Sequence, residues 1–154
     1  MNELLSETLQ GGCNCGAVRY TLTPGFRMGP YACHCTLCQT RTGSAFAEHM
    51  VVLRSALEVP GADWEGKTVN PSGAEVMLYG CNSCGARLWG ENLTVPGLAT
   101  LRCGTLDRSA EVEPEAHLWV SSKQAWITLP HGTKAMDEQP RSNEEWMREL
   151  GHMP

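Results

Sequence analysis

Short apolar segments separated by turn-forming residues make up most of the chain, which has 16 glycines and 9 prolines among its 154 residues. In Ala17–Leu22, apolar and polar residues alternate, which is the period of a half-buried strand. Further predicted strands are Ala45–Leu53, Glu75–Tyr79, Ala86–Trp89, Leu98–Leu106 and His117–Val120. The stretches Gly61–Gly73 and Pro130–Pro140 are expected to be loops. The pattern therefore predicts a mainly β fold.

One segment near the C-terminus has the signals of a helix. Ser142 and Glu145 have the spacing of a capping box, in which each side chain binds a backbone N–H group at the start of the helix. Trp146 and Leu150 lie one turn apart on one face, and Gly151 follows as a C-cap. The sequence predicts one short C-terminal helix that covers either the core or a partner chain.

Length and charge limit the classes of protein to which the chain can belong. Residues 1–154 are enough for one domain and contain no linker, so we expect a single domain. No apolar run approaches the roughly 20 residues that cross a bilayer, so we expect no membrane partner. The formal net charge is −5 and no basic block occurs, which argues against nucleic acid as a partner. The sequence leaves the oligomeric state open.

Seven of the eight cysteines fall into three clusters. The clusters are Cys13 and Cys15, then Cys33, Cys35 and Cys38, then Cys81 and Cys84. The first residues, MNELLSETLQGG, have neither the basic nor the apolar region of an export signal, so we expect a reducing, cytoplasmic location. In that location, spaced cysteine pairs favour zinc ligation over a disulfide framework.

The number of cysteines fits two zinc sites of different kinds. A structural Zn²⁺ takes four protein ligands, whereas a catalytic Zn²⁺ keeps three protein ligands and one open position. The two outer pairs can close a four-thiolate site, and glycines beside them, Gly16 and Gly85, supply the necessary backbone bends. This site would fasten the N-terminal strand to the middle of the chain.

The central triplet of Cys33, Cys35 and Cys38 would then bind a second zinc ion. Its remaining position could hold water, a substrate thiol or a fourth protein ligand, and we interpret it as open. The alternative is a second structural site completed by Cys103 or a histidine. Cys103 lies in an apolar strand and is expected in the core, while His34 is expected to face away from the metal.

Several stretches of the sequence together point to a known family. They are GCNCGAVRY (12–20), CHCTLC (33–38), TGSAF (42–46), CNSCG (81–85), GTLD (104–107), PEAHLWV (114–120) and AW (125–126). In order, spacing and flanking residues they resemble the glutathione-dependent formaldehyde-activating enzyme family, which includes centromere-protein-V-like domains. The resemblance extends from about Gly11 to Trp126. It implies a zinc-stapled β-tent of short antiparallel sheets.

The resemblance also implies residue roles and an activity. The implied structural zinc ligands are Cys13, Cys15, Cys81 and Cys84, and the implied catalytic zinc ligands are Cys33, Cys35 and Cys38. The implied reaction condenses glutathione with formaldehyde to S-(hydroxymethyl)glutathione, which is a carbon–sulfur lyase reaction run in reverse. Coordination by zinc makes a thiol a thiolate, which is the nucleophilic form.

Four residues outside the cysteine clusters are further candidates. Arg41 is the nearest candidate cation for the carboxylates of glutathione, although an arginine in this position is more commonly a surface residue without a partner. Ser44 could donate a hydrogen bond to the substrate, or Gly43-Ser44 could be a plain turn. His117 is expected to satisfy a buried hydrogen bond, and Trp126 is expected to pack.

Two classes of function follow from these features. The leading hypothesis is a zinc-dependent lyase-like enzyme that joins glutathione, or a similar small thiol, to formaldehyde or a related electrophile. The alternative is a non-catalytic zinc-binding interaction module, which would need a fourth protein ligand on the triplet and an exposed contact surface. Metal content measured together with glutathione binding separates the two.

Overall fold

The computed structural model describes residues 3–61 and 64–153 and has a mainly β fold. The strands are β1 Leu9–Gly12, β2 Arg19–Leu22, β3 Arg27–Cys33, β4 Ala47–Leu53, β5 Leu57–Glu58, β6 Trp64–Val69, β7 Glu75–Gly80, β8 Arg87–Asn92, β9 Leu98–Arg102, β10 Ala116–Leu118, β11 Lys134–Ala135 and β12 Gly151–His152. The helices are α1 Thr36–Thr42 and α2 Asn143–Leu150, with short 3₁₀ turns η1 Glu3–Ser6, η2 Arg54–Ala56, η3 Cys103–Thr105, η4 Ser109–Glu111 and η5 Val120–Ser122. The predicted mainly β fold with a short C-terminal helix is confirmed.

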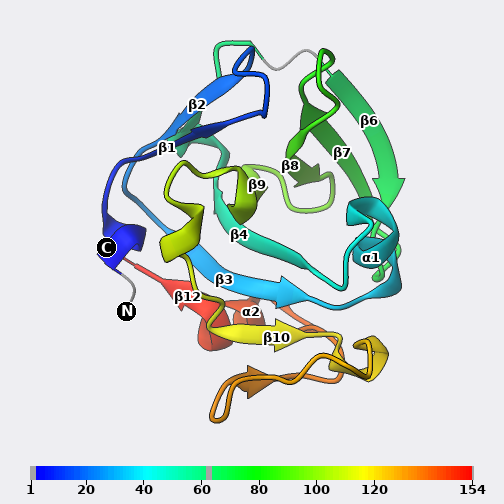
Figure 1. The fold of residues 1–154 in the computed structure, drawn as a ribbon. Helices are drawn as coiled ribbons and strands as arrows, with labels where there is room; N and C mark the ends of the chain where they lie inside the picture. The colour runs from blue at the N-terminus through cyan, green and yellow to red at the C-terminus, as the bar shows by residue number, and fades with distance from the viewer. Residues whose placement is uncertain (1–2, 62–63, 154) are drawn as a thin grey trace.

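The strands form two sheets (Figure 1). The smaller sheet has the order β1-β2-β5 and is antiparallel. The larger sheet has nine strands in the order β11-β10-β3-β4-β9-β8-β7-β6, with β12 paired to β3. Most of its pairs are antiparallel, but β10 runs parallel to both β3 and β11. The larger sheet therefore joins segments far apart in the sequence, and it supplies the walls of the site described below.

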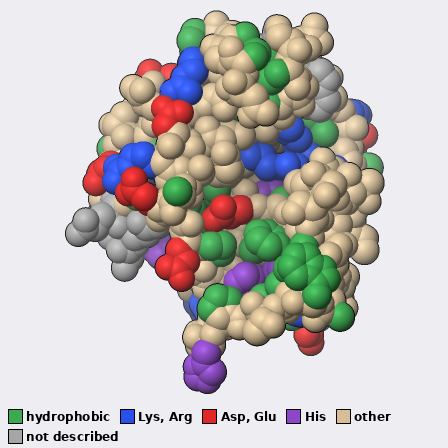
Figure 2. Space-filling view, in the orientation of Figure 1, with side chains coloured by type: hydrophobic (Ala, Val, Ile, Leu, Met, Phe, Trp, Pro, Cys, Tyr) green, Lys and Arg blue, Asp and Glu red, His purple; other side chains and the backbone are tan. Residues whose placement is uncertain are grey.

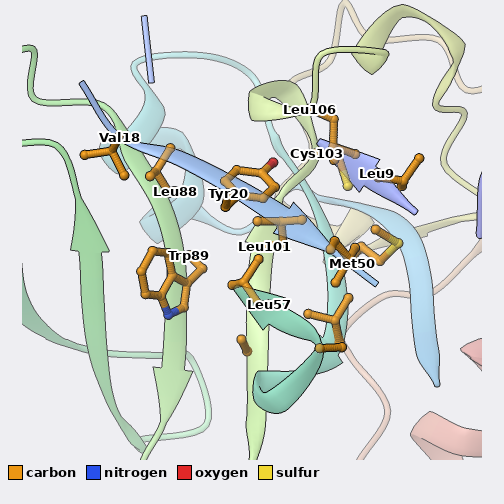
Figure 3. Close-up of a cluster of buried hydrophobic side chains, with 14 of the residues drawn as sticks. Leu9, Val18, Tyr20, Met50, Leu57, Leu88, Trp89, Leu101, Cys103 and Leu106 are labelled. Atoms are coloured by element: carbon orange, nitrogen blue, oxygen red, sulfur yellow. The ribbon is translucent and has the colours of Figure 1, made fainter. Parts of the chain in front are cut away.

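The first hydrophobic core contains side chains from β1, β2, β4, β5, β8 and β9 (Figure 3). Leu22, Leu88 and Leu101 are fully buried there, and Trp89 is nearly so. Burial of each such side chain contributes about 1.5–3 kcal/mol. Cys103 lies in the same cluster at 0% exposure, which confirms that it belongs to the core.

A second cluster lies under α2. Trp146 of α2 contacts Tyr31 of β3, with ring centroids 5.4 Å apart, and Leu150 is 1% exposed. The Ser142 side chain accepts a hydrogen bond from the Glu145 N–H group, as predicted, whereas the Glu145 carboxylate accepts from the Arg141 N–H group rather than from that of Ser142. Helix α2 thus covers a core of its own chain.

The structure corrects several expectations about local structure. The predicted strand Leu98–Leu106 ends at Arg102, and Cys103–Thr105 form the 3₁₀ turn η3. Residues 64–69, expected in a loop, form β6, an edge strand whose charged Lys67 pairs with Glu75 of β7. The predicted loop 130–140 contains the short strand β11. Helix α1 was not expected from the sequence, because Thr36–Thr42 contains three threonines, which have low helix propensity. Residues 62 and 63 of the first loop lie outside the described residues.

Charged side chains on the surface occur mostly in small groups of opposite sign. On the face drawn in Figure 2, red and blue side chains lie next to one another around β1 and η4. Arg19 pairs with Asp107, and Arg108 pairs with both Glu7 and Glu111. None of the described helices is both long enough and apolar enough to cross a bilayer.

Candidate metal centres and the adjoining cleft

Four cysteines from two separate turns meet at one place. Cys13 and Cys15 come from the turn between β1 and β2, and Cys81 and Cys84 from the turn between β7 and β8. Their sulfur atoms lie within 4.8 Å of one another; Cys15 Sγ is 3.6 Å from Cys13 Sγ and 3.7 Å from Cys81 Sγ. A tetrahedron with zinc–sulfur bonds of about 2.3 Å has edges of about 3.8 Å. This four-cysteine group therefore fits a zinc ion.

Backbone conformation and hydrogen bonds shape the two turns. Gly16 and Gly85 have φ values of 80° and 72°, which confirms the expected left-handed bends beside the cysteines. The Val18 N–H group donates to Cys13 Sγ at 3.3 Å. The pKa of Cys13 is lowered to about 6, and this hydrogen bond is the largest cause of the shift. This turn thus favours the thiolate form of Cys13, which is the form that binds metal.

The three remaining clustered cysteines meet where β3 passes into α1. Cys33 ends β3, Cys35 is the N-cap of α1, and Cys38 lies in the first turn of the helix. The Cys38 N–H group donates to Cys35 Sγ at 3.3 Å. Hydrogen bonds with Cys33 and then Cys38 lower the pKa of Cys35. All three side chains are buried, and their sulfur atoms lie within 4.8 Å of one another. This three-cysteine group can hold a metal ion.

Neither candidate for a fourth protein ligand joins the three-cysteine group. Cys103 is buried in the first core. The His34 ring faces His117, with 2.9 Å between His34 Nε2 and His117 Nδ1, which confirms that His117 satisfies a buried hydrogen bond. Among the described residues, Cys33, Cys35 and Cys38 are the only His, Cys, Asp or Glu side chains whose ligand atoms come together at this place. None of the eight cysteines forms a disulfide.

A cleft of about 500 Å³ opens beside the three-cysteine group. Its floor is one face of the larger sheet, and its rim includes the segment before α2 and the first turns of that helix. Residues that line it include Cys33, Cys35, Cys38, Tyr31, His49, Val51, Arg87, Thr100, Leu118 and Trp146. This volume lies in the range of small-molecule sites. The four-cysteine group does not line the cleft.

Two basic side chains that sequence reasoning missed line this cleft, and a third lies beside them in the sheet. Arg87 of β8 and His49 of β4 line it, and Arg102 of β9 lies directly opposite His49 in the strand register. The pKa of Arg87 is lowered to about 9, mainly by burial and further by the positive charges of Arg102 and Arg41. The pKa of His49 is lowered to about 3, mainly by burial and further by the positive charges of Arg102 and Arg87. Nothing in the local sequence indicates that these three residues meet.

The other predicted residues occupy different places. Arg41 lines the cleft, and its Nη2 atom donates to Thr68 Oγ1 at 2.5 Å and to the Val69 carbonyl at 3.0 Å. Ser44 is exposed and lies outside the residues that line the cleft. The expectation that Trp126 packs is wrong, because its side chain is 73% exposed and donates to Gln124.

The fold and the two cysteine groups define a mainly β protein with two sites that can hold metal ions. Residues 8–122 match the family model described as "Glutathione-dependent formaldehyde-activating enzyme", and the protein belongs to that family. A protein of Halomonas elongata named "Putative glutathione-dependent formaldehyde-activating enzyme" is 25% identical over 126 residues, which cover 79% of this chain and 80% of that protein. The resemblance noted from the motifs is thereby confirmed.

Proposed function

We propose that this protein is a zinc-dependent carbon–sulfur lyase-like enzyme that joins glutathione, or a similar thiol, to formaldehyde or a related small electrophile. The observation that carries the proposal is the three-cysteine group at the wall of a cleft, with three thiol ligands and space for a small molecule beside them. Family membership supports the choice of thiol and electrophile.

The two cysteine groups receive different roles in this proposal. The four-cysteine group holds a structural zinc ion that fastens the β1–β2 turn to the β7–β8 turn. The three-cysteine group holds a catalytic zinc ion, so that each chain contains two. When bound there, Zn²⁺ would favour the thiolate form of a substrate thiol.

The cleft performs the remaining tasks of the proposed reaction. Its walls hold the thiol and the electrophile next to each other and exclude water from one side. In the addition, sulfur forms a bond to the carbonyl carbon, the carbonyl π-electron pair passes to oxygen, and the thiol proton ends on that oxygen. No oxidant or reductant is consumed.

Charge at the cleft supports an anionic thiol. Glutathione carries two carboxylates, and the protein as a whole is acidic. Arg41 is held at the cleft by its bonds to Thr68 and Val69, and we assign it to attract the peptide. Ser44 is not among the residues that line the cleft, so the proposal gives it no role.

The setting of the reaction is part of the proposal. Thiolate ligands and a thiol substrate both require reducing conditions, which favours the cytoplasm. We also propose that residues 1–154 act as one domain, because β12 and α2, beyond the family match, pack on β3 within it.

Exchange NMR between free glutathione and its formaldehyde adduct tests the proposed function. The uncatalysed reaction must be subtracted at matched pH and thiol concentration. Zinc-loaded protein should accelerate the exchange, and Cys38→Ser should return it to the uncatalysed rate. Cys103→Ala is the control, because this thiol belongs to neither group. An exchange rate that zinc-loaded protein leaves unchanged, even at high concentration, would favour the non-catalytic zinc module.

A further inference from the structure

Arg87, Arg102 and His49 come from three neighbouring strands on one face of the larger sheet. The order of these strands is β8, β9, β4, and His49 lies opposite Arg102. On β9, Thr100 faces the cleft, and Arg102, two residues further along the strand, shares that face. Arg87 and His49 therefore line the cleft beside the three-cysteine group, and Arg102, which is not itself among the lining residues, lies next to His49 on the same face of the sheet.

All three side chains carry buried nitrogen atoms without a hydrogen-bond partner among the described residues. These atoms are Nε and Nη1 of Arg87, Nε and Nη2 of Arg102, and Nε2 of His49. Neither arginine forms an ion pair within the described part of the chain, and neither donates to a sulfur atom of the three-cysteine group. Buried guanidinium groups normally have partners, because leaving them unpaired costs free energy.

The shape of the free donors favours a planar anion with two oxygens. Nε and Nη2 of Arg102 form one edge of the flat guanidinium, and such an edge binds both oxygens of a carboxylate at once. Gly90 leaves room for the other guanidinium, since a Cβ atom there would lie 3.3 Å from Arg87 Nη2. Arg87 remains positively charged at neutral pH, because its lowered pKa is still about 9.

We propose that Arg87, Arg102 and His49 form a carboxylate-binding subsite in the wall of the cleft. The subsite lies beside the three-cysteine group, so the carboxylate it holds belongs to a molecule that reaches the reacting position. Two sources have this chemistry. One is a carboxylate of the thiol substrate, and the other is a carboxylate on the electrophile, as in an aldehyde acid. The subsite itself does not depend on the proposed function, but the identification of these two sources rests on it.

Acetate is the direct probe of the subsite, because it has a carboxylate and neither a thiol nor an aldehyde. Titration of zinc-loaded protein, followed by NMR of the arginine Nε–H groups, should give saturable shifts at Arg87 and Arg102. Arg102→Gln should weaken acetate binding about tenfold or more. Arg102→Lys should also weaken it, because lysine keeps the charge and loses the two-donor edge. Arg141→Gln, an exposed residue at the same cleft, is the matched control and should bind acetate normally.

Thermal stability separates a ligand-binding role from a structural one. If the arginines await a ligand, Arg102→Gln should melt no lower than wild type without acetate, and only wild type should be stabilised by acetate. A lower melting temperature for Arg102→Gln, with acetate stabilisation retained, would overturn the proposal. Arg87→Gln provides a second variant for the same measurements, and zinc content is measured in each.

Two substrate pairs identify the source of the carboxylate. If the thiol supplies it, Arg102→Gln should weaken binding of glutathione but not of its diethyl ester. If the electrophile supplies it, the variant should slow adduct formation with glyoxylate but not with formaldehyde. Either result supports the subsite. Acetate affinity that is equal in wild type, Arg87→Gln and Arg102→Gln would refute it. Acetate binding that depends on the arginines, in a protein without adduct exchange, would retain the subsite and refute the proposed activity.

Discussion

The two cysteine groups differ in how they are exposed and in what surrounds them. In the four-cysteine group, Cys15 and Cys84 are exposed to solvent, yet the group borders no part of the cleft. In the three-cysteine group every side chain is buried, yet all three line the cleft. Solvent exposure and access for a substrate are thus separate properties here.

The number of ligands and the folding of the backbone explain this difference. Four thiols from two turns complete a tetrahedron, so a metal there has no position left for a substrate. Three thiols from a single strand-to-helix transition line the cleft, so a metal ion held by them would keep one position for a further ligand. The first arrangement connects distant segments of the chain, whereas the second is local and borders the cleft.

The largest expected effect comes from breaking the four-cysteine group. Cys81→Ser should lower the free energy of unfolding by about 4 kcal/mol or more, because it removes a ligand that joins two segments 66 residues apart. Urea denaturation with zinc analysis measures this. Ser83→Ala in the same turn is the control and should stay near wild type. A normal unfolding free energy for Cys81→Ser would contradict the structural role.

Breaking the three-cysteine group should affect stability less. Cys38→Ser should lower the free energy of unfolding by about 1–2 kcal/mol, remove one zinc equivalent, and reduce adduct exchange to the uncatalysed rate. The same denaturation and metal analyses check it. Equal losses of stability in Cys38→Ser and Cys81→Ser would end the division into structural and catalytic sites.

Graded chelation should distinguish the two metal ions in the wild-type protein. The three-thiolate site, with one exchangeable position, should release its zinc first, and the closed site should release its zinc more slowly. Colorimetric zinc release, followed in parallel with far-UV circular dichroism, should show one equivalent lost before the fold changes. Simultaneous release of both equivalents would remove the distinction.

The smallest expected effect concerns Glu48. Its titration must be distinguished from that of the cysteines in any study of how the two groups depend on pH. Burial raises the pKa of Glu48 from 4.5 to about 7, and its Oε1 atom has no hydrogen-bond partner among the described residues. A carboxyl group with a raised folded-state pKa stabilises the fold below pH 4.5, and this contribution is lost as pH rises through 7.

Glu48→Gln should therefore gain stability relative to wild type between pH 5 and pH 8, by about 1 kcal/mol when partial exposure is taken into account. Urea denaturation at both pH values measures the difference. A constant difference between the two proteins across this range would show that Glu48 does not titrate there, and that the pH dependence belongs to the cysteines.

The sequence predicted the cysteine groups well because the spacing within each cluster is local and the number of clustered cysteines fits one group of four and one of three. Cys13, Cys15, Cys81 and Cys84 could be assigned to one group from their number and their neighbouring glycines. Helix α1 was missed because its threonines have low helix propensity and its N-cap is a cysteine. The available signal was Gly43, which ends the helix in a left-handed conformation with φ 66°.

The cleft could not be predicted in the same way, because strand pairing creates it. Arg87, Arg102 and His49 are far apart or unremarkable in the sequence, and only the register of β4, β8 and β9 brings them together. Strand β6 was read as a loop because it is a polar edge strand with little apolar alternation. Trp126 was expected to pack from its residue type alone, but it lies on the surface.

Cadmium-113 NMR of the cadmium-substituted protein tests the central claim most directly, because it reports each metal site separately. The account predicts two resonances, one from the four-cysteine group and one from the three-cysteine group. Glutathione should shift only the second, as a fourth sulfur ligand joins it, and Cys38→Ser should remove that response. Two resonances that glutathione leaves unchanged, or a shift of the four-cysteine resonance instead, would contradict the assignment of a closed and an open metal site.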